Sequence, residues 1–129
     1  EKYQNKKLSD FADLQNVDFL LLEKDKIDRI AMIDMLWIKN NVIKYIIEVE
    51  NTTKFTSGIQ RASNVEIAIP KLMIIPDKRK DEFLGINDPL FTNNFKNYNW
   101  KYIFYSDIEN IKISRKIDHA LIDAFTKEI

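Results

Sequence analysis

Three acidic residues lie in two strongly apolar stretches, and they constrain what this chain can become. Residues 30–38 and 42–50 are rich in Ile, Val, Tyr and Trp, the residue types that favour β-strands. The first stretch contains Asp34, and the second ends in Glu48 and Glu50. Because side chains alternate between the two faces of a strand, Glu48 and Glu50 share a face. Carboxylates in apolar strands cost free energy unless their charge is compensated, and a hard divalent cation would compensate all three.

The connection between these two strands decides whether the three acids meet. Residues 39–41 join the strands, and the two asparagines among them tolerate the left-handed backbone of tight turns. A two-residue loop would pair Lys39 with Val42 and leave Asp34 and Glu48 on opposite faces. A three-residue loop or a β-bulge would place the acids on one face. We predict the second arrangement.

Length and composition limit the number of domains and the kinds of site that the chain can form. The chain has 129 residues, which suits a single domain with a core of its own. It begins at Glu1 without methionine, so we expect an excerpt of a longer protein. The absence of cysteine excludes disulfides, thiolate zinc sites and cysteine nucleophiles. No signal peptide or membrane-spanning run is visible, so we expect a cytoplasmic protein without a membrane partner.

Charge is balanced over the whole chain but not along it. The sequence has 20 basic and 20 acidic residues. Residues 51–80 carry six basic residues against two acidic ones, a net charge of +4 directly after the acidic strand. Such a segment favours an anionic partner held beside the acids, although it also suits a solvated face.

The remaining segments predict one α/β domain built on a mixed sheet. Ser57 and Gln60 have the spacing of a capping box, which would start a helix at Gly58. Residues 1–7 should lack regular structure, and residues 24–28 should form a charged turn. We expect strands over 17–23, 30–38, 42–50, 71–75 and 100–105, and helices over 9–15, 58–68, 77–85, from Asp88-Pro89 onward and from Ser114 onward. The predicted order is therefore αβββαβ followed by ααβα.

Few other residues offer chemistry. His119 is the only histidine, and the spacing of its helix predicts that it faces solvent. With only Gly58 and Gly85, the chain has no glycine-rich phosphate loop. A hydrolase with paired acids for sugars is disfavoured, because no sugar-binding aromatic cluster accompanies the acids.

The three acids remain the candidate site. Oxygen donors on rigid strands suit Mg²⁺ or Mn²⁺, and a metal-bound water is a nucleophile for phosphodiester hydrolysis. The alternative is that Glu48 and Glu50 lie on a solvated strand face with Asp34 at an edge.

Four segments together resemble the PD-(D/E)XK nuclease superfamily, which has the restriction-endonuclease-like fold. They are Asp34 within IDMLW, EVE at 48–50, TSGIQR at 56–61 and PKLMIIPDKRKDEF at 70–83. The αβββαβ order matches the core of that superfamily over about residues 8–85, with the ααβα remainder as an addition. The resemblance implies a metal-dependent DNA endonuclease of a restriction or defence protein. Its partners would be DNA and either a second copy or other domains of a longer chain.

The resemblance also implies roles for the acids. Asp34 and Glu48 match the two acids that bind Mg²⁺ in the superfamily. Two residues after the second acid, most members have a lysine that positions or polarises the attacking water, but this chain has Glu50, as in E-x-E variants. Three readings stay open: Glu50 orients water or ligates the metal, a lysine such as Lys54 or Lys71 reaches in, or the domain is a noncatalytic module for DNA binding or assembly.

In the superfamily, the helix after the acidic strand lies beside the active site. Helix N-termini attract phosphate, and arginine binds it through two hydrogen bonds. A capping box and a surface ion pair would explain the same residues without DNA. The residues implied to contact DNA phosphates are Lys54, Ser57, Gln60, Arg61 and Lys71.

Overall fold

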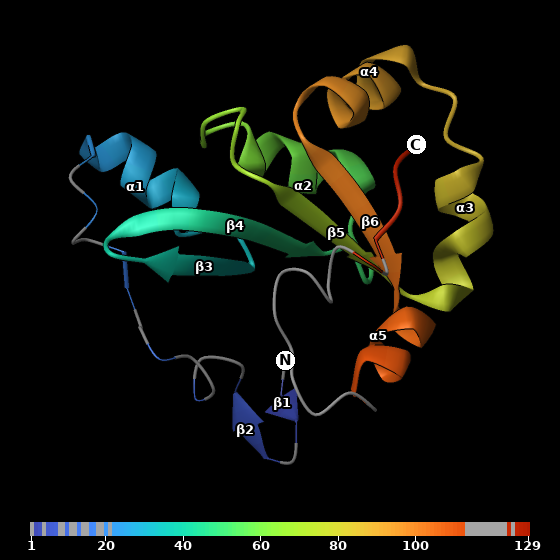
Figure 1. Cartoon of the computed structure of the whole chain (residues 1–129), viewed down its shortest axis with the longest axis horizontal. Coiled ribbons are helices and arrows are strands. Elements are labelled where there is room, and N and C mark those ends of the chain that lie inside the picture. The colour runs from blue at the N-terminus through green and yellow to red at the C-terminus, as the bar shows by residue number, and fades with distance from the viewer. Residues whose placement is uncertain are drawn as a thin grey trace.

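The computed structural model describes residues 22–112 and 126–129, together with residues 2–3, 5–7, 10, 13, 16–17, 20 and 124. None of the described helices has both the length and the apolar character needed to cross a membrane. In chain order the elements (Figure 1) are β1 (Lys2–Tyr3), β2 (Lys6–Lys7), α1 (Lys24–Ile30), β3 (Met35–Lys39), β4 (Val42–Val49), α2 (Phe55–Ala62), β5 (Lys71–Ile75), the 3₁₀ helix η2 (Asp77–Arg79), α3 (Lys80–Leu84), α4 (Pro89–Asn97), β6 (Trp100–Phe104) and α5 (Tyr105–Lys112).

The main sheet has four strands in the order β3-β4-β5-β6. Strands β3 and β4 form an antiparallel hairpin, whereas β4, β5 and β6 run parallel to one another. Parallel neighbours need a crossover connection, which α2 supplies between β4 and β5 and α3 with α4 between β5 and β6. The prediction of an α/β domain on a mixed sheet is confirmed.

The hairpin combines a tight turn with a β-bulge. Residues 40–41, both asparagine, have φ of 53° and 59°, the left-handed conformation that suits a two-residue hairpin turn. The pairing register then shifts by one residue between Trp37 and Ile38. The shift brings Asp34 level with Glu48 across the hairpin. The predicted register is confirmed in its β-bulge form.

Helices cover the two faces of the sheet unequally (Figure 1). Helices α1 to α4 pack with one face into the larger core, and α5 packs on the opposite face through Ile108 and Ile111. The ring of Phe83 lies at the centre of an aromatic cluster in the larger core. Its ring neighbours, 4.8–6.0 Å away between centroids, are Phe55, Phe91, Phe95 and Tyr102.

Several predicted elements are confirmed. Strand β5 occupies residues 71–75 as expected, and β6 ends one residue before the predicted boundary. Helix α4 begins at the predicted Asp-Pro pair, where the Asp88 carboxylate accepts a hydrogen bond from the Leu90 backbone. Over 77–85 the chain forms η2 and α3, but the Asp77 carboxylate accepts hydrogen bonds from Ser106 instead of capping its own helix.

The N-terminal third differs from the prediction. Residues 24–28 belong to α1 and not to a turn, so Asp34 directly precedes β3 instead of lying inside a strand. The alternating charges of α1 suit a helix that buries little more than Ile30. Residues 2–7, expected to lack regular structure, contain the short β1–β2 hairpin. At the described positions of 17–23 there is no strand, and Leu20 is buried in the core.

Helix α2 also differs, because it begins at Phe55 and ends at Ala62. Ser57 is therefore inside the first turn, and the N-cap residue is Lys54, which makes no side-chain cap. Phe55, Ile59 and Ala62 are buried at helical spacing, so packing against the sheet overrides the local capping signal.

Helix α5 was not expected. The residues on which the predicted helix over 9–15 depends, and most of the helix from Ser114 onward with His119, lie outside the described residues.

The aromatic cluster predicts the effect of a core truncation. Phe83→Ala should lower the free energy of unfolding by about 3–5 kcal/mol, because it removes a ring from a packed site and leaves a cavity. Urea denaturation would measure the change. Leu90→Ala is the control, since Leu90 is 82% exposed on the neighbouring helix and should change stability little. Equal effects of the two substitutions would contradict the assigned core.

Candidate active site

Glu48 and Glu50 lie at the carboxyl end of β4, and both are fully buried (0% exposed). Strand β4 is an interior strand of the sheet, and its carboxyl end lies at the same edge as those of β5 and β6. The prediction that the two acids share a face agrees with their common contact on α2. The alternative of a solvated strand face is wrong, because a helix covers both side chains.

Helix α2 approaches the two acids closely because it has a glycine at the point of contact. A Cβ atom added at Gly58 would overlap the Glu50 Oε1 atom and would lie 3.4 Å from the Cβ of Glu48. Only hydrogen fits there without displacing a carboxylate. The helix backbone therefore lies directly against the acidic pair.

Arg61, one turn beyond Gly58 on the same helix, provides the positive charge for both acids. Its Nε donates to Glu48 Oε1 and Oε2 at 3.0 and 3.1 Å, and its Nη2 donates to Glu48 Oε2 at 2.6 Å. Nη2 also donates to Glu50 Oε1 at 3.2 Å. One guanidinium thus binds both buried carboxylates, with 21% of the Arg61 side chain exposed.

The loop after β4 holds Glu50 from its other side. The Thr53 hydroxyl donates to Glu50 Oε2. Arg79 Nη1 donates to the backbone oxygens of Glu50 at 2.9 Å and Thr53 at 2.8 Å. The Arg79 guanidinium is itself fixed by two hydrogen bonds to Glu82 and lies 4.1 Å above the Phe55 ring. The position of Glu50 is therefore set by contacts to two other elements.

Asp34 lies at the open end of the hairpin. Its Oδ2 accepts a hydrogen bond of 2.8 Å from the backbone nitrogen of Val49, where the β3–β4 ladder ends. This contact holds the carboxylate beside the end of β4 and close enough to influence Glu48 electrostatically. Asp34 and Glu48 are brought together, and Glu48 and Glu50 are joined through Arg61.

The surroundings shift the proton affinity of this cluster. Burial raises the pKa of Glu48 to about 7 from 4.5, Arg61 opposes that rise, and the Asp34 carboxylate adds to it. The hydrogen bonds to Glu48 raise the pKa of Arg61, so the guanidinium stays charged. The site therefore contains one acid that titrates near neutral pH.

A metal site formed by all three acids is not assembled in the described part of the chain. No group of three or more acidic, histidine or cysteine side chains there is close enough to hold one ion. The chemistry of the donors still fits a hard cation, since paired carboxylate oxygens already bind a positive group, the Arg61 guanidinium. Asp34 and Glu48 are neighbouring carboxylates whose oxygens are of the type that holds such an ion.

Four of the five residues expected to contact DNA lie on α2 or at its start. Lys54 is exposed at the start of α2, and Gln60 is exposed on the helix itself. Ser57 is half-buried in the first turn. Arg61, expected to face DNA, instead pairs with the acids. The other three polar side chains therefore lie on, or directly before, the helix that covers the acidic pair.

Lys71 does not belong to this set. Its Nζ donates to the backbone oxygens of Glu66 (3.1 Å), Ile67 (3.3 Å), Ile69 (2.8 Å) and Tyr98 (3.1 Å). The residue is 2% exposed, and burial lowers its pKa to about 8. It also lies at the amino end of β5, opposite the edge that carries the acids. The expectation that Lys71 contacts phosphate or reaches the acids is therefore wrong.

Two contacts of this site were not predicted from the sequence. Arg61 pairs with Glu48 and Glu50, and Arg79 fixes the loop after β4. The i, i+3 spacing of Gly58 and Arg61 was an available signal, because it places a gap and a cation on one helix face.

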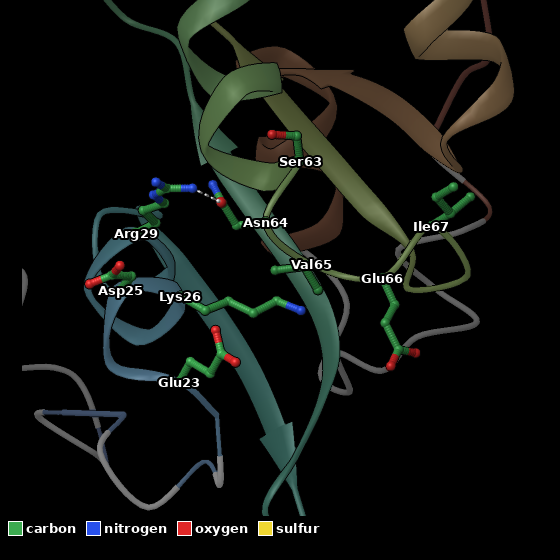
Figure 2. Close-up of a pocket in the computed structure, with 9 residues that line it drawn as sticks. All are labelled: Glu23, Asp25, Lys26, Arg29, Ser63, Asn64, Val65, Glu66 and Ile67. Carbon is green, nitrogen blue, oxygen red and sulfur yellow. Dashed lines mark hydrogen bonds between the residues drawn. The ribbon is translucent and has the colours of Figure 1, made fainter.

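An open groove lies apart from the acids, between α1 and the segment after α2 (Figure 2). Its volume is about 650 Å³. Figure 2 shows Lys26 extending across it and Arg29 donating to Asn64 at 3.4 Å. The lining carries both signs of charge, with Lys26 and Arg29 near Glu23 and Glu66.

The family of the type II restriction enzyme NmeDI C-terminal domain matches residues 1–129. The chain belongs to this family. It is thus a domain of a type II restriction enzyme, in agreement with the restriction context that the sequence implied. No curated protein and no solved structure matched it.

The raised pKa of Glu48 predicts a specific pH dependence. Between pH 4.5 and about 7 the folded protein holds the Glu48 proton more tightly than the unfolded chain. Stability contributed by this group is therefore complete below pH 4.5 and is lost as the pH rises through 7. Relative to Glu48→Gln, which cannot titrate, the wild type should lose at most about 3 kcal/mol over this range. Urea unfolding in a chelator at several pH values would measure it, and a pH-independent difference would contradict it.

Proposed function

We propose that this domain is the nuclease domain of its restriction enzyme and hydrolyses DNA phosphodiester bonds with Mg²⁺ or Mn²⁺. One observation carries the proposal: two fully buried carboxylates, with Asp34 beside them, lie at the edge where the parallel strands end. In open α/β sheets, ligands bind outside the carboxyl ends of the strands. The resemblance to PD-(D/E)XK nucleases supports the same residues.

The roles divide among the three acids. Asp34 and Glu48 would hold the ion, and Glu50 would complete the site by ligating it or by orienting water. A divalent ion held here would polarise a phosphodiester oxygen and would lower the pKa of a water bound to it. Thr53 and Arg79 keep Glu50 in position, so the acid does not depend on the ion for its orientation.

The exposed side of α2 would face DNA. Lys54 is the N-cap residue of α2, and Ser57 and Gln60 lie in its first two turns. The positive end of the helix dipole and the exposed Lys54 side chain favour phosphate. Contacts to phosphate position DNA but carry no sequence information, so base recognition belongs to other parts of the enzyme or to a second subunit.

A second candidate function is a noncatalytic module for DNA binding or assembly. The observation in its favour is that Arg61 already neutralises the buried acids, and the described residues contain no ready cluster of three metal ligands. This reading predicts DNA binding without cleavage and little effect of Glu48→Ala on that binding.

Plasmid nicking by the intact protein separates the two functions. With Mg²⁺ or Mn²⁺, Asp34→Ala and Glu48→Ala should each reduce the nicking rate at least roughly 100-fold, because each removes an oxygen ligand. Asp81→Asn is the matched control, since Asp81 is an exposed acid on α3 and should leave the rate unchanged. Nicking by Glu48→Ala at the wild-type rate would reject Glu48 as part of the site, and DNA binding without nicking by the wild type would favour the noncatalytic module.

A further inference from the structure

The guanidinium of Arg61 occupies the oxygens that the proposed metal needs. Both oxygens of Glu48 accept hydrogen bonds from Arg61, at 2.6–3.1 Å. The nearer oxygen of Glu50 accepts a fourth at 3.2 Å. A divalent ion binds such oxygens at about 2.0–2.1 Å, from directions that the guanidinium now fills. Two cations cannot use the same lone pairs in a buried site, since each excludes and repels the other.

Resting on the proposed metal site, we propose that Arg61 is an intramolecular competitor of the divalent ion. In the metal-free protein its guanidinium takes the place of the ion, and ion binding releases it from Glu48. The released side chain is then free to bind a phosphate of the DNA. Arg61 would thus set the affinity of the site for the metal and link metal binding to substrate binding.

The contacts around the site show which partner can move. Glu50 is held by Thr53, by the Arg79 contact to its backbone and by the close approach of Gly58. Glu48 lies inside the regular ladder between β4 and β5. Arg61 is in the last turn of α2 and keeps 21% of its side chain exposed. The backbones of both acids and the side chain of Glu50 are held by other contacts, whereas the arginine side chain has a route to solvent.

The arrangement also explains how the acids stay buried without metal. Two buried carboxylates without a partner would destabilise the fold, and a resident cation stabilises their charged form when the ion is absent. Arginine suits the task because its planar group binds a carboxylate through two hydrogen bonds and never loses its charge.

Calorimetric titration of the intact protein with Mn²⁺ tests the proposal. Arg61→Gln should bind Mn²⁺ roughly tenfold more tightly than the wild type, because the competing hydrogen bonds are gone. Arg61→Lys, which keeps a charge but loses the paired geometry, should lie between them, and it decides the question if the glutamine variant does not fold. The control is Lys78→Gln, which removes an exposed positive charge from η2 and should leave the affinity unchanged.

Thermal unfolding gives a second readout, because Arg61→Gln should lower the melting temperature without metal and should increase the rise in melting temperature that Mn²⁺ causes. Without metal, Arg61→Gln should melt below the wild type, because the acids lose their counter-charge. With saturating Mn²⁺ its melting temperature should rise by more than that of the wild type.

The outcomes distinguish this inference from the proposed function. Unchanged or weaker Mn²⁺ binding in both Arg61 variants, with binding abolished by Glu48→Ala, would overturn the competitor role and leave the metal site standing. Tightening by Lys78→Gln as large as that by Arg61→Gln would also overturn it, because any positive charge would then suffice. No Mn²⁺ binding by the wild type or any variant would reject the metal site and the nuclease proposal together.

Discussion

Burial of two carboxylates under one helix is the constraint on which the rest of this structure depends. Glu48 and Glu50 lose their hydration, and a guanidinium that reaches both offsets part of the cost. That contact needs α2 to lie directly on the strand end, which needs Gly58. The placement of the crossover helix α2 and the charge balance of the candidate site therefore depend on the same contacts, those of Gly58 and Arg61 with the two acids.

The same constraint explains the loop after β4. Arg79 binds two backbone oxygens there, stacks on Phe55 and pairs with Glu82. Phe55 in turn contacts the Phe83 ring at the centre of the core. A chain of contacts thus connects the candidate site to the hydrophobic core, so the acids are held by the packing of α2 and α3.

Membership of the NmeDI C-terminal domain family places these acids in a restriction enzyme. Read as a nuclease site, the cluster lacks the strand lysine usual in PD-(D/E)XK enzymes, and a positive charge comes from α2 instead. Read as a structural cluster, it is a satisfied ion pair. Both readings use the same atoms, and they differ in whether Arg61 yields its place to a metal.

The sequence by itself determined strands β4, β5 and β6, the asparagine turn of the hairpin, the shared face of Glu48 and Glu50 and the cap of α4. Each follows from alternation, turn chemistry or capping within a short stretch. Only the tertiary structure decided the start of α2, the partner of Arg61 and the burial of Lys71. These depend on contacts between segments 11–29 residues apart, such as Arg61 with Glu50 and Arg79 with the Glu50 backbone. Packing can override a local signal there, as it does at Ser57, because burying Phe55 and Ile59 gains more free energy than a cap.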